Sequence, residues 1–211
     1  MKGLLLKDYY MMMKHCKLSF IISVIFIAVS LANSDNTFFL FYPFILCGII
    51  PINLLNFDEK SRWTQYSGSL PYTKAQIVSS KYLIGLFVQI ATMIFTITAH
   101  GIKMSINGGL DLEYFFEIIM LIVTAITFSS ISLPFAFKFG IEKGIMAFYL
   151  SVGVLAVISY FAFGMREFPQ TDFQAEMEPT VFLVFFCLIG MAVYIISWLL
   201  SIAFYRKREL G

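Results

Sequence analysis

Charged residues are scarce in this chain of 211 residues: Asp, Glu, Lys and Arg make up 13% of it, against about 25% in an ordinary globular domain. Cysteine is also rare, and the odd number present (Cys16, Cys47 and Cys187) argues against a disulfide framework. A net charge of +2 offers little attraction to nucleic-acid phosphates. This composition excludes a soluble enzyme, a disordered segment and a nucleic-acid-binding protein.

Apolar and aromatic residues are abundant instead, at 59% and 18% of the chain, with 24 Phe and 11 Tyr. One water-soluble core could not bury them. A membrane-spanning helix needs about 20 predominantly apolar residues. The sequence therefore predicts an all-α integral membrane protein that forms a single domain over residues 1–211. Its six spans lie at about 18–32, 37–56, 82–102, 115–137, 144–163 and 180–205.

The basic residues predict the orientation, because Lys and Arg are enriched in cytoplasmic loops. Thirteen of them lie in the N-terminal segment, the loops between spans two and three and between spans four and five, and the C-terminal tail. The other side has only Lys103 and Arg166, together with most of the acids. We therefore expect a multi-pass membrane protein with both termini in the cytoplasm.

The N-terminal segment, residues 1–17, predicts an amphipathic helix lying in the cytoplasmic interface of the membrane. Its apolar arc on a helical wheel contains Leu5, Leu6, Tyr9, Met12, Met13 and Cys16. The opposite arc contains Lys7, Asp8, Lys14 and His15. Two alternatives stay open at this point: a basic flank without a defined helix, and a signal peptide cleaved after Ser30-Leu31-Ala32.

The cytoplasmic loop 57–81 is too long for a simple turn between two spans. Asp58 and Glu59 favour the start of a short helix, in which Trp63, Tyr66 and Leu70 form one apolar stripe while Lys60 and Arg62 lie off it. Pro71 ends that helix, and Thr73 caps a second one that continues into span three. Such a pair of helices is either a docking surface for a cytosolic partner or rests on lipid.

Catalytic motifs are missing from the sequence. There is no G-x-x-x-x-G-K-[ST], G-x-S-x-G, H-E-x-x-H or C-x-x-C pattern. We therefore expect no catalytic residue, no metal ion and no cofactor on this chain. His100 and Glu117 lie near the outer ends of spans three and four, either as a proton or substrate site or as ordinary boundary residues. Since no ionisable residue lies at mid-membrane, an ion-coupled pump is disfavoured.

Polar residues within the spans fall in helical stripes, which either pack neighbouring helices closely or line a weakly polar path. Pro134 in span four should also leave a backbone carbonyl without its helical donor. Our candidates for lining such a path are Gln89, Thr92, Thr96, Thr124, Thr127 and Ser197.

Three segments carry a resemblance to a known family: Met1-Lys2-Gly3-Leu4-Leu5-Leu6-Lys7-Asp8, Ser69-Leu70-Pro71, and Ile77-Val78-Ser79-Ser80-Lys81-Tyr82. With six spans and both termini inside, the chain resembles permease subunits of type 2 ABC exporters (the ABC-2 family). It is nearest the small permeases with which Gram-positive bacteria export peptides such as bacteriocins and modulin-like toxins.

The resemblance implies that residues 1–17 are an elbow helix and that loop 57–81 is the coupling helix seated on a separate ABC ATPase subunit. Asp58, Glu59, Lys60, Arg62, Trp63 and Tyr66 would contact that ATPase, with Leu70 and Pro71 fixing the angle. ATP and Mg²⁺ would bind the ATPase, and a second permease subunit, identical or paralogous, would complete the transporter. The family's outer gate helices have no obvious counterpart in the short acidic segment Met165–Pro179.

The function that follows is the membrane subunit of an ATP-driven exporter. Its apolar, Phe-rich interior suits an amphipathic or hydrophobic cargo, such as a peptide. The main alternative is the substrate-binding subunit of an energy-coupling-factor vitamin importer, for which the spacing of Ala28 and Ala32 is one weak sign. A membrane-embedded enzyme and a passive scaffold are two further alternatives.

Overall fold

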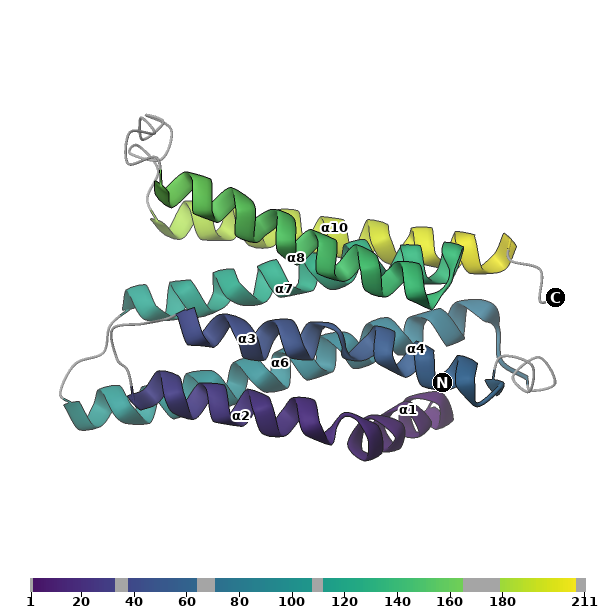
Figure 1. Cartoon of the computed structure of the whole chain (residues 1–211), viewed down its shortest axis with the longest axis horizontal. Coiled ribbons are helices and arrows are strands. Elements are labelled where there is room, and N and C mark those ends of the chain that lie inside the picture. Colours follow the sequence, from purple (N-terminus) through teal and green to yellow (C-terminus); the bar gives the residue numbers. More distant parts are fainter. Residues whose placement is uncertain (1, 33–37, 64–70, 108–111, 165–178, 208–211) are drawn as a thin grey trace.

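The computed structural model describes residues 2–32, 38–63, 71–107, 112–164 and 179–207, and within these ranges the regular elements are all helices (Figure 1). Their bounds are α1 Lys2–His15, α2 Lys17–Ala32, α3 Phe38–Gly48, α4 Ile50–Lys60, α6 Lys74–Asn107, α7 Leu112–Phe139, α8 Ile141–Gly164 and α10 Pro179–Lys207. Tyr66, Leu70 and the acidic segment 165–178 lie outside the described residues.

Five stretches of these helices are long and apolar enough to cross a membrane, and the bent pair α1–α2 can supply a sixth. The prediction of an all-helical membrane protein is confirmed at this level. Helices α1 and α2 meet at an angle of 67°. The predicted first span, 18–32, coincides with α2, and the assignment of α1 as an interfacial helix stays a prediction.

Both ends of the described chain lie at the same end of the bundle (Figure 1). The starts of α2, α6 and α8 and the ends of α4, α7 and α10 lie there too. A hydrogen bond fastens two of these ends, since Lys74 Nζ donates to the carbonyl of Arg206 at 3.3 Å. Because Lys138 and Arg206 lie in the last turns of α7 and α10 on this side, we call it the basic end.

Span two is formed by α3 and α4, which are separated only at Ile49. Pro51 lies in the first turn of α4, where its missing N–H is tolerated. Its ring packs against Gly85 of α6 so closely that a Cβ on Gly85 would lie 2.6 Å from Pro51 Cγ. The absence of a side chain at Gly85 therefore permits α4 and α6 to approach.

The expectation that Asp58 and Glu59 start a new helix is wrong. Helix α4 continues to Lys60, so both acids lie in its last turn, where the negative end of the helix dipole disfavours them. For Asp58 this cost is offset by Lys7 and Lys81, whose ammonium groups each lie 2.6 Å from one of its carboxylate oxygens. Glu59 is exposed to solvent.

Helix α6 begins with a reciprocal capping box. The amide of Gln76 donates to Thr73 Oγ1 at 3.2 Å, and the amide of Thr73 donates to Gln76 Oε1 at 3.1 Å. Thr73 thus caps the helix as expected from sequence. The second helix of the loop also continues into span three as expected, because α6 runs without a break from Lys74 to Asn107.

The connection between α7 and α8 consists of Gly140 alone, with φ +98, a left-handed conformation that favours glycine. The predicted loop 138–143 is therefore mostly helical: Lys138 lies in the last turn of α7 and Lys143 in the first turn of α8. Four residues after the turn, a Cβ on Gly144 would lie 2.5 Å from Ala136 Cβ. A glycine at position 144 lets α8 lie directly against α7.

Candidate functional site at the basic end of the bundle

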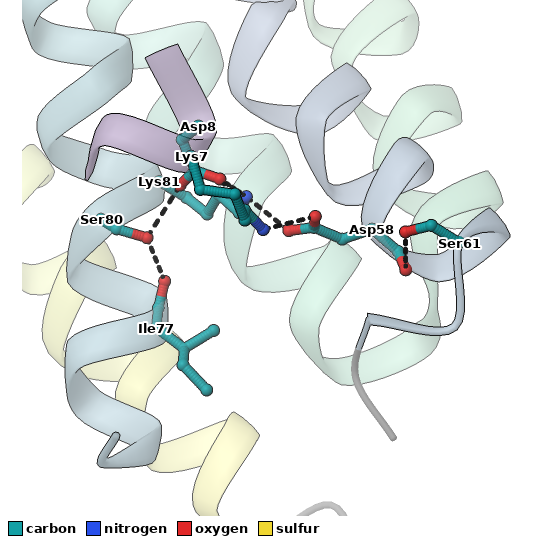
Figure 2. Close-up of polar contacts among 7 residues, drawn as sticks. All are labelled: Lys7, Asp8, Asp58, Ser61, Ile77, Ser80 and Lys81. Atoms are coloured by element: carbon teal, nitrogen blue, oxygen red, sulfur yellow. Dashed lines mark hydrogen bonds and ion pairs between the residues drawn. The ribbon is translucent and has the colours of Figure 1, made fainter. Parts of the chain in front are cut away.

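Four charged side chains meet where α1, α4 and α6 come together (Figure 2). Lys81 Nζ lies 2.6 Å from Asp8 Oδ1 and 2.6 Å from Asp58 Oδ2. Lys7 Nζ lies 2.6 Å from Asp58 Oδ1 and 3.3 Å from Asp8 Oδ1. Each lysine thus contacts both carboxylates, and we call Lys7, Asp8, Asp58 and Lys81 the ionic cluster.

The ionic cluster is buried. Asp8 is 0% exposed, Lys81 1% and Asp58 3%, whereas the side chain of Lys7 is 22% exposed. Removing a charge from water is costly unless it is paired and hydrogen-bonded. With two positive and two negative members, the cluster is neutral as a whole, which lets three helices bury charge at their junction.

Neighbouring groups complete the hydrogen bonding of the ionic cluster. Ser80 Oγ contacts Asp8 Oδ2 at 3.0 Å and also the carbonyl of Ile77 at 2.9 Å (Figure 2). Lys7 Nζ lies 4.2 Å from the ring centroid of Trp63, in a cation–π contact. Trp63 is the last described residue before segment 64–70. The ionic cluster is therefore in contact with residues 58–63, which we call the base of the loop.

The base of the loop presents charge to solvent. After α4 ends, the Ser61 hydroxyl donates to the carbonyl of Asp58 at 3.2 Å, and Arg62 adopts φ 53. Glu59, Lys60 and Arg62 are exposed, as is Pro71 on the far side of the segment that is not described. Asp58 differs from these exposed residues, which were also predicted to contact a partner. It is buried, and its carboxylate forms ion pairs with Lys7 and Lys81.

The structure corrects the expected position of Asp8. On the helical wheel Asp8 was placed on the water-facing arc of α1, but the buried residues of this helix are Leu4, Asp8 and Met12, one helical turn apart. Leu6 and Tyr9 of the predicted apolar arc are 55% and 40% exposed. Helix α1 therefore packs on the bundle through a stripe that includes a charge, because the lysines of the cluster neutralise it.

A second, uncharged network holds α6 against α10 and α7. The Tyr82 hydroxyl lies 2.7 Å from both Ser197 Oγ and Ser201 Oγ, and the Tyr194 hydroxyl donates to the carbonyl of Tyr82 at 2.7 Å. The Ser197 hydroxyl also donates to the carbonyl of Ser130. We call Tyr82, Tyr194, Ser197 and Ser201 the hydroxyl network.

The acceptor of Ser197 is explained by Pro134. In an α-helix the carbonyl of residue 130 would accept from the amide of residue 134, and proline has none. The carbonyl expected to lose its donor is thus that of Ser130, and a hydroxyl from α10 takes the place of the missing N–H. Such re-satisfaction by a neighbouring helix makes a proline tolerable inside a membrane span.

The remaining residues predicted to line a path have packing partners in this structure. Gln89 Nε2 donates to the carbonyl of Phe44 at 3.0 Å, and Thr92 Oγ1 donates to Cys47 Sγ at 3.2 Å, so both hold α6 to α3. Thr96 donates to a carbonyl one turn back in α6, and Thr124 and Thr127 do so in α7. A role of these residues in transport stays a prediction.

The two residues of the predicted outer-boundary pair, His100 and Glu117, differ in exposure. His100 is 5% exposed, whereas Glu117 is exposed on the surface of α7. Among the described residues Glu117 forms no ion pair or hydrogen bond with His100. A joint role of the two residues stays a prediction.

Sequence reasoning did not single out Lys7, Asp8 and Lys81 as members of one site. A signal was available in part: Asp8 is the only acid in a segment with four lysines, and Lys81 directly precedes a long apolar run. Neither position reveals which helices meet. The pairing depends on the angle between α1 and α2, which no local pattern encodes.

A comparison with protein families decides the assignment of the chain. Residues 3–206 match the model of a family described as ABC-2 family transporter protein. The chain belongs to the ABC-2 family. No curated protein and no solved structure matches it.

Membership in the ABC-2 family makes the chain a membrane permease component of an ABC transporter, a class that works with an ATPase partner. The resemblance seen in the sequence is confirmed at the level of this family. The vitamin-importer alternative gains no support from the match. Together with the apolar helices, the match indicates a multi-pass membrane protein.

Proposed function

We propose that this ABC-2 permease is the transmembrane subunit of an ATP-driven exporter and that it carries an amphipathic or hydrophobic substrate, such as a peptide, across a bacterial plasma membrane. It pairs with a second permease subunit and with separate ATPase subunits that bind ATP and Mg²⁺. The basic end of the bundle faces the cytoplasm, as the distribution of Lys and Arg indicates.

The observation that carries the proposal is the position of the ionic cluster at the base of loop 57–81. Lys81 lies two turns into α6, Asp58 lies in the last turn of α4, and Asp8 belongs to α1, which precedes α2. A force applied to the loop thus reaches three helices through short charged contacts. This is the connection that an ATPase outside the membrane needs in order to move the spans.

We assign the contact surface for the ATPase to the exposed residues Glu59, Lys60 and Arg62 and to Trp63, and we include Tyr66 from the sequence alone. Asp58 acts differently in this proposal: it transmits the movement and does not touch the partner. Leu70 and Pro71 set the direction in which the chain returns to α6. When the ATPase pair closes on ATP, the loop moves with it and displaces α1, α4 and α6. This displacement switches the permease between its inward-facing and outward-facing states.

Charge reversal at the contact surface tests the proposal. The chain is purified from native membranes with its bound proteins, which are identified by mass spectrometry, and Arg62→Glu is compared with the parent. We expect one soluble ATPase to co-purify with the parent, and Arg62→Glu to lower its yield severalfold. Glu142→Lys is the matched control, because this exposed acid at the start of α8 lies at the same end of the bundle but outside the loop.

Trp63→Ala tests coupling separately from binding. The variant should hydrolyse ATP in the assembled complex while exporting less cargo, because the loop no longer transmits its movement fully. Export from cells or vesicles is compared with the ATPase rate of the same preparation. Normal export by Trp63→Ala, or a parent chain that purifies without any ATPase, would remove the basis of the proposal.

A further inference from the structure

An apolar groove of about 420 Å³ lies between α7 and α10, on a side of the bundle away from the ionic cluster. It opens onto the lateral surface of the helix bundle, where Ile131 and Phe135 are each 44% exposed and Ile196 is 57% exposed. The hydroxyls in its floor have partners already, since Ser130 donates to the carbonyl of Ile126 and Ser197 to that of Ser130. The floor therefore suits a hydrocarbon chain.

The length of the groove corresponds to one leaflet of a bilayer. It is lined from Ser130 to Phe139 along α7 and from Val193 to Phe204 along α10, which at 1.5 Å per residue is about 14 Å and about 17 Å. Half of a 30 Å hydrocarbon layer is about 15 Å. A lipid chain inserted from the basic end would thus fill the groove, whereas a membrane-crossing helix would extend far beyond it.

Two lysines lie at the end of the groove nearest the basic end, Lys138 among its lining residues and Lys143 beside the lining residue Phe139. Lys138 Nζ lies 4.7 Å from the ring centroid of Phe139 and 4.8 Å from that of Phe204. Lys143 Nζ lies 5.5 Å from the same Phe139 ring. No carboxylate among the described residues forms an ion pair with either lysine, Glu142 included.

We propose that this groove binds an anionic phospholipid of the leaflet at the basic end, with one acyl chain between α7 and α10 and the phosphate at Lys138 and Lys143. The hydrophobic length of the groove selects a lipid, and two ammonium groups without a carboxylate partner among the described residues select an anionic headgroup over a zwitterionic one. This site is independent of the ATPase contact, and the inference goes beyond the proposed transport function.

Lipid titration of the purified full-length chain, followed by native mass spectrometry, tests the site. The probes are phosphatidylglycerol and phosphatidylcholine with identical acyl chains. We expect tighter binding of phosphatidylglycerol, and a loss of about fivefold in that affinity for Lys138→Gln, as one surface lysine is worth about 1 kcal/mol to an anionic lipid. Lys138→Arg should keep the affinity, as should Lys17→Gln, which removes an exposed lysine at the start of α2.

Filling the groove provides a second, independent test. Leu200→Trp places a large ring among the lining residues and should weaken binding of both lipids, whereas Leu199→Trp, on the neighbouring outward position of α10, should not. Equal affinity of the parent for both lipids, or equal effects of Lys138→Gln and Lys17→Gln, would overturn the proposal. So would a change of oligomeric mass with Leu200→Trp, since a second copy of the chain would then be the occupant.

Discussion

Two neighbouring residues of α6, Lys81 and Tyr82, fasten this helix to different parts of the bundle by different chemistry. Lys81 belongs to the ionic cluster and joins α6 to α1 and α4. Tyr82 belongs to the hydroxyl network and joins α6 to α10. Because successive side chains of a helix point about 100° apart, two adjacent residues of α6 can contact different sets of helices.

The two networks should respond differently to damage. The ionic cluster is neutral only when all four members are present, so the loss of one leaves a buried charge without a partner. The hydroxyl network contains no charge, and a serine that loses one partner can turn to a carbonyl of its own helix. We therefore expect the first network to behave as a unit and the second as a sum of small contributions.

The largest expected effect is that of Asp8→Ala. The substitution leaves Lys81 with one carboxylate and the cluster with a net positive charge, and breaking a buried ion pair from one side costs about 3–5 kcal/mol. We expect a loss of this size in the free energy of unfolding, measured by denaturant titration in detergent micelles. Glu59→Ala is the control, since this exposed carboxylate of α4 forms no ion pair with a described residue.

A double variant shows whether the ionic cluster acts as a unit. Asp8→Ala combined with Lys81→Met removes one charge of each sign and leaves the pair of Lys7 and Asp58. The combined loss should be clearly smaller than the sum of the two single losses, by about 1 kcal/mol or more. If the losses simply add, the four charges are independent and the contrast with the hydroxyl network fails.

The next effect concerns α8, which is held against α7 by close packing at Gly144. Gly144→Ala would bring a Cβ to 2.5 Å from Ala136 Cβ and 2.8 Å from its Cα, so the backbones must separate. Overpacking of this kind costs about 1–3 kcal/mol. Unfolding in micelles should report that loss, with a lowered thermal midpoint.

Gly153→Ala is the matched control within the same helix. A Cβ at that position meets nothing within 4 Å, so the added methyl group should leave stability unchanged or raise it slightly through better helix propensity. Equal losses for the two variants would mean that α8 is sensitive along its whole length. The packing at Gly144 would then have no special importance.

Much of the fold could be predicted from the sequence because the spans are long and apolar. The expected spans 115–137, 144–163 and 180–205 lie within α7, α8 and α10, whose observed bounds extend a few residues further at each end. The cap at Thr73 was also predictable, since a capping box involves only four consecutive residues. Local signals of this kind do not depend on what the helices pack against.

The candidate site was predictable only in part. The importance of loop 57–81 follows from its length and charge, but the placement of Asp58 and Asp8 was wrong. An acidic residue near an apolar run is ordinarily predicted to be exposed to solvent. That prediction fails when lysines from other helices form ion pairs with its carboxylate. Which lysines do so depends on tertiary contacts between residues 51 to 73 positions apart, as for Lys7 with Asp58 and Lys81 with Asp8.

The smallest expected effect is that of Tyr82→Phe, which removes the hydroxyl shared by Ser197 and Ser201 and keeps the ring. Hydrogen bonds between membrane helices contribute about 0.6 kcal/mol each on average, so the loss of two should be about 1 kcal/mol. Ser197 still donates to the carbonyl of Ser130, which limits the damage. Tyr149→Phe is the control, because this tyrosine of α8 is 61% exposed.

The same variant decides whether the two networks are independent. Tyr82→Phe combined with Asp8→Ala should lose the sum of the two single effects, because the hydroxyl network and the ionic cluster share no partner and fasten α6 to different helices. A Tyr82→Phe loss as large as that of Asp8→Ala would mean that the neutral network is as indispensable as the charged one. A combined loss of unfolding free energy well below the sum would mean that the two networks are energetically coupled through α6. Lys81 and Tyr82 would then contribute to one cooperative unit.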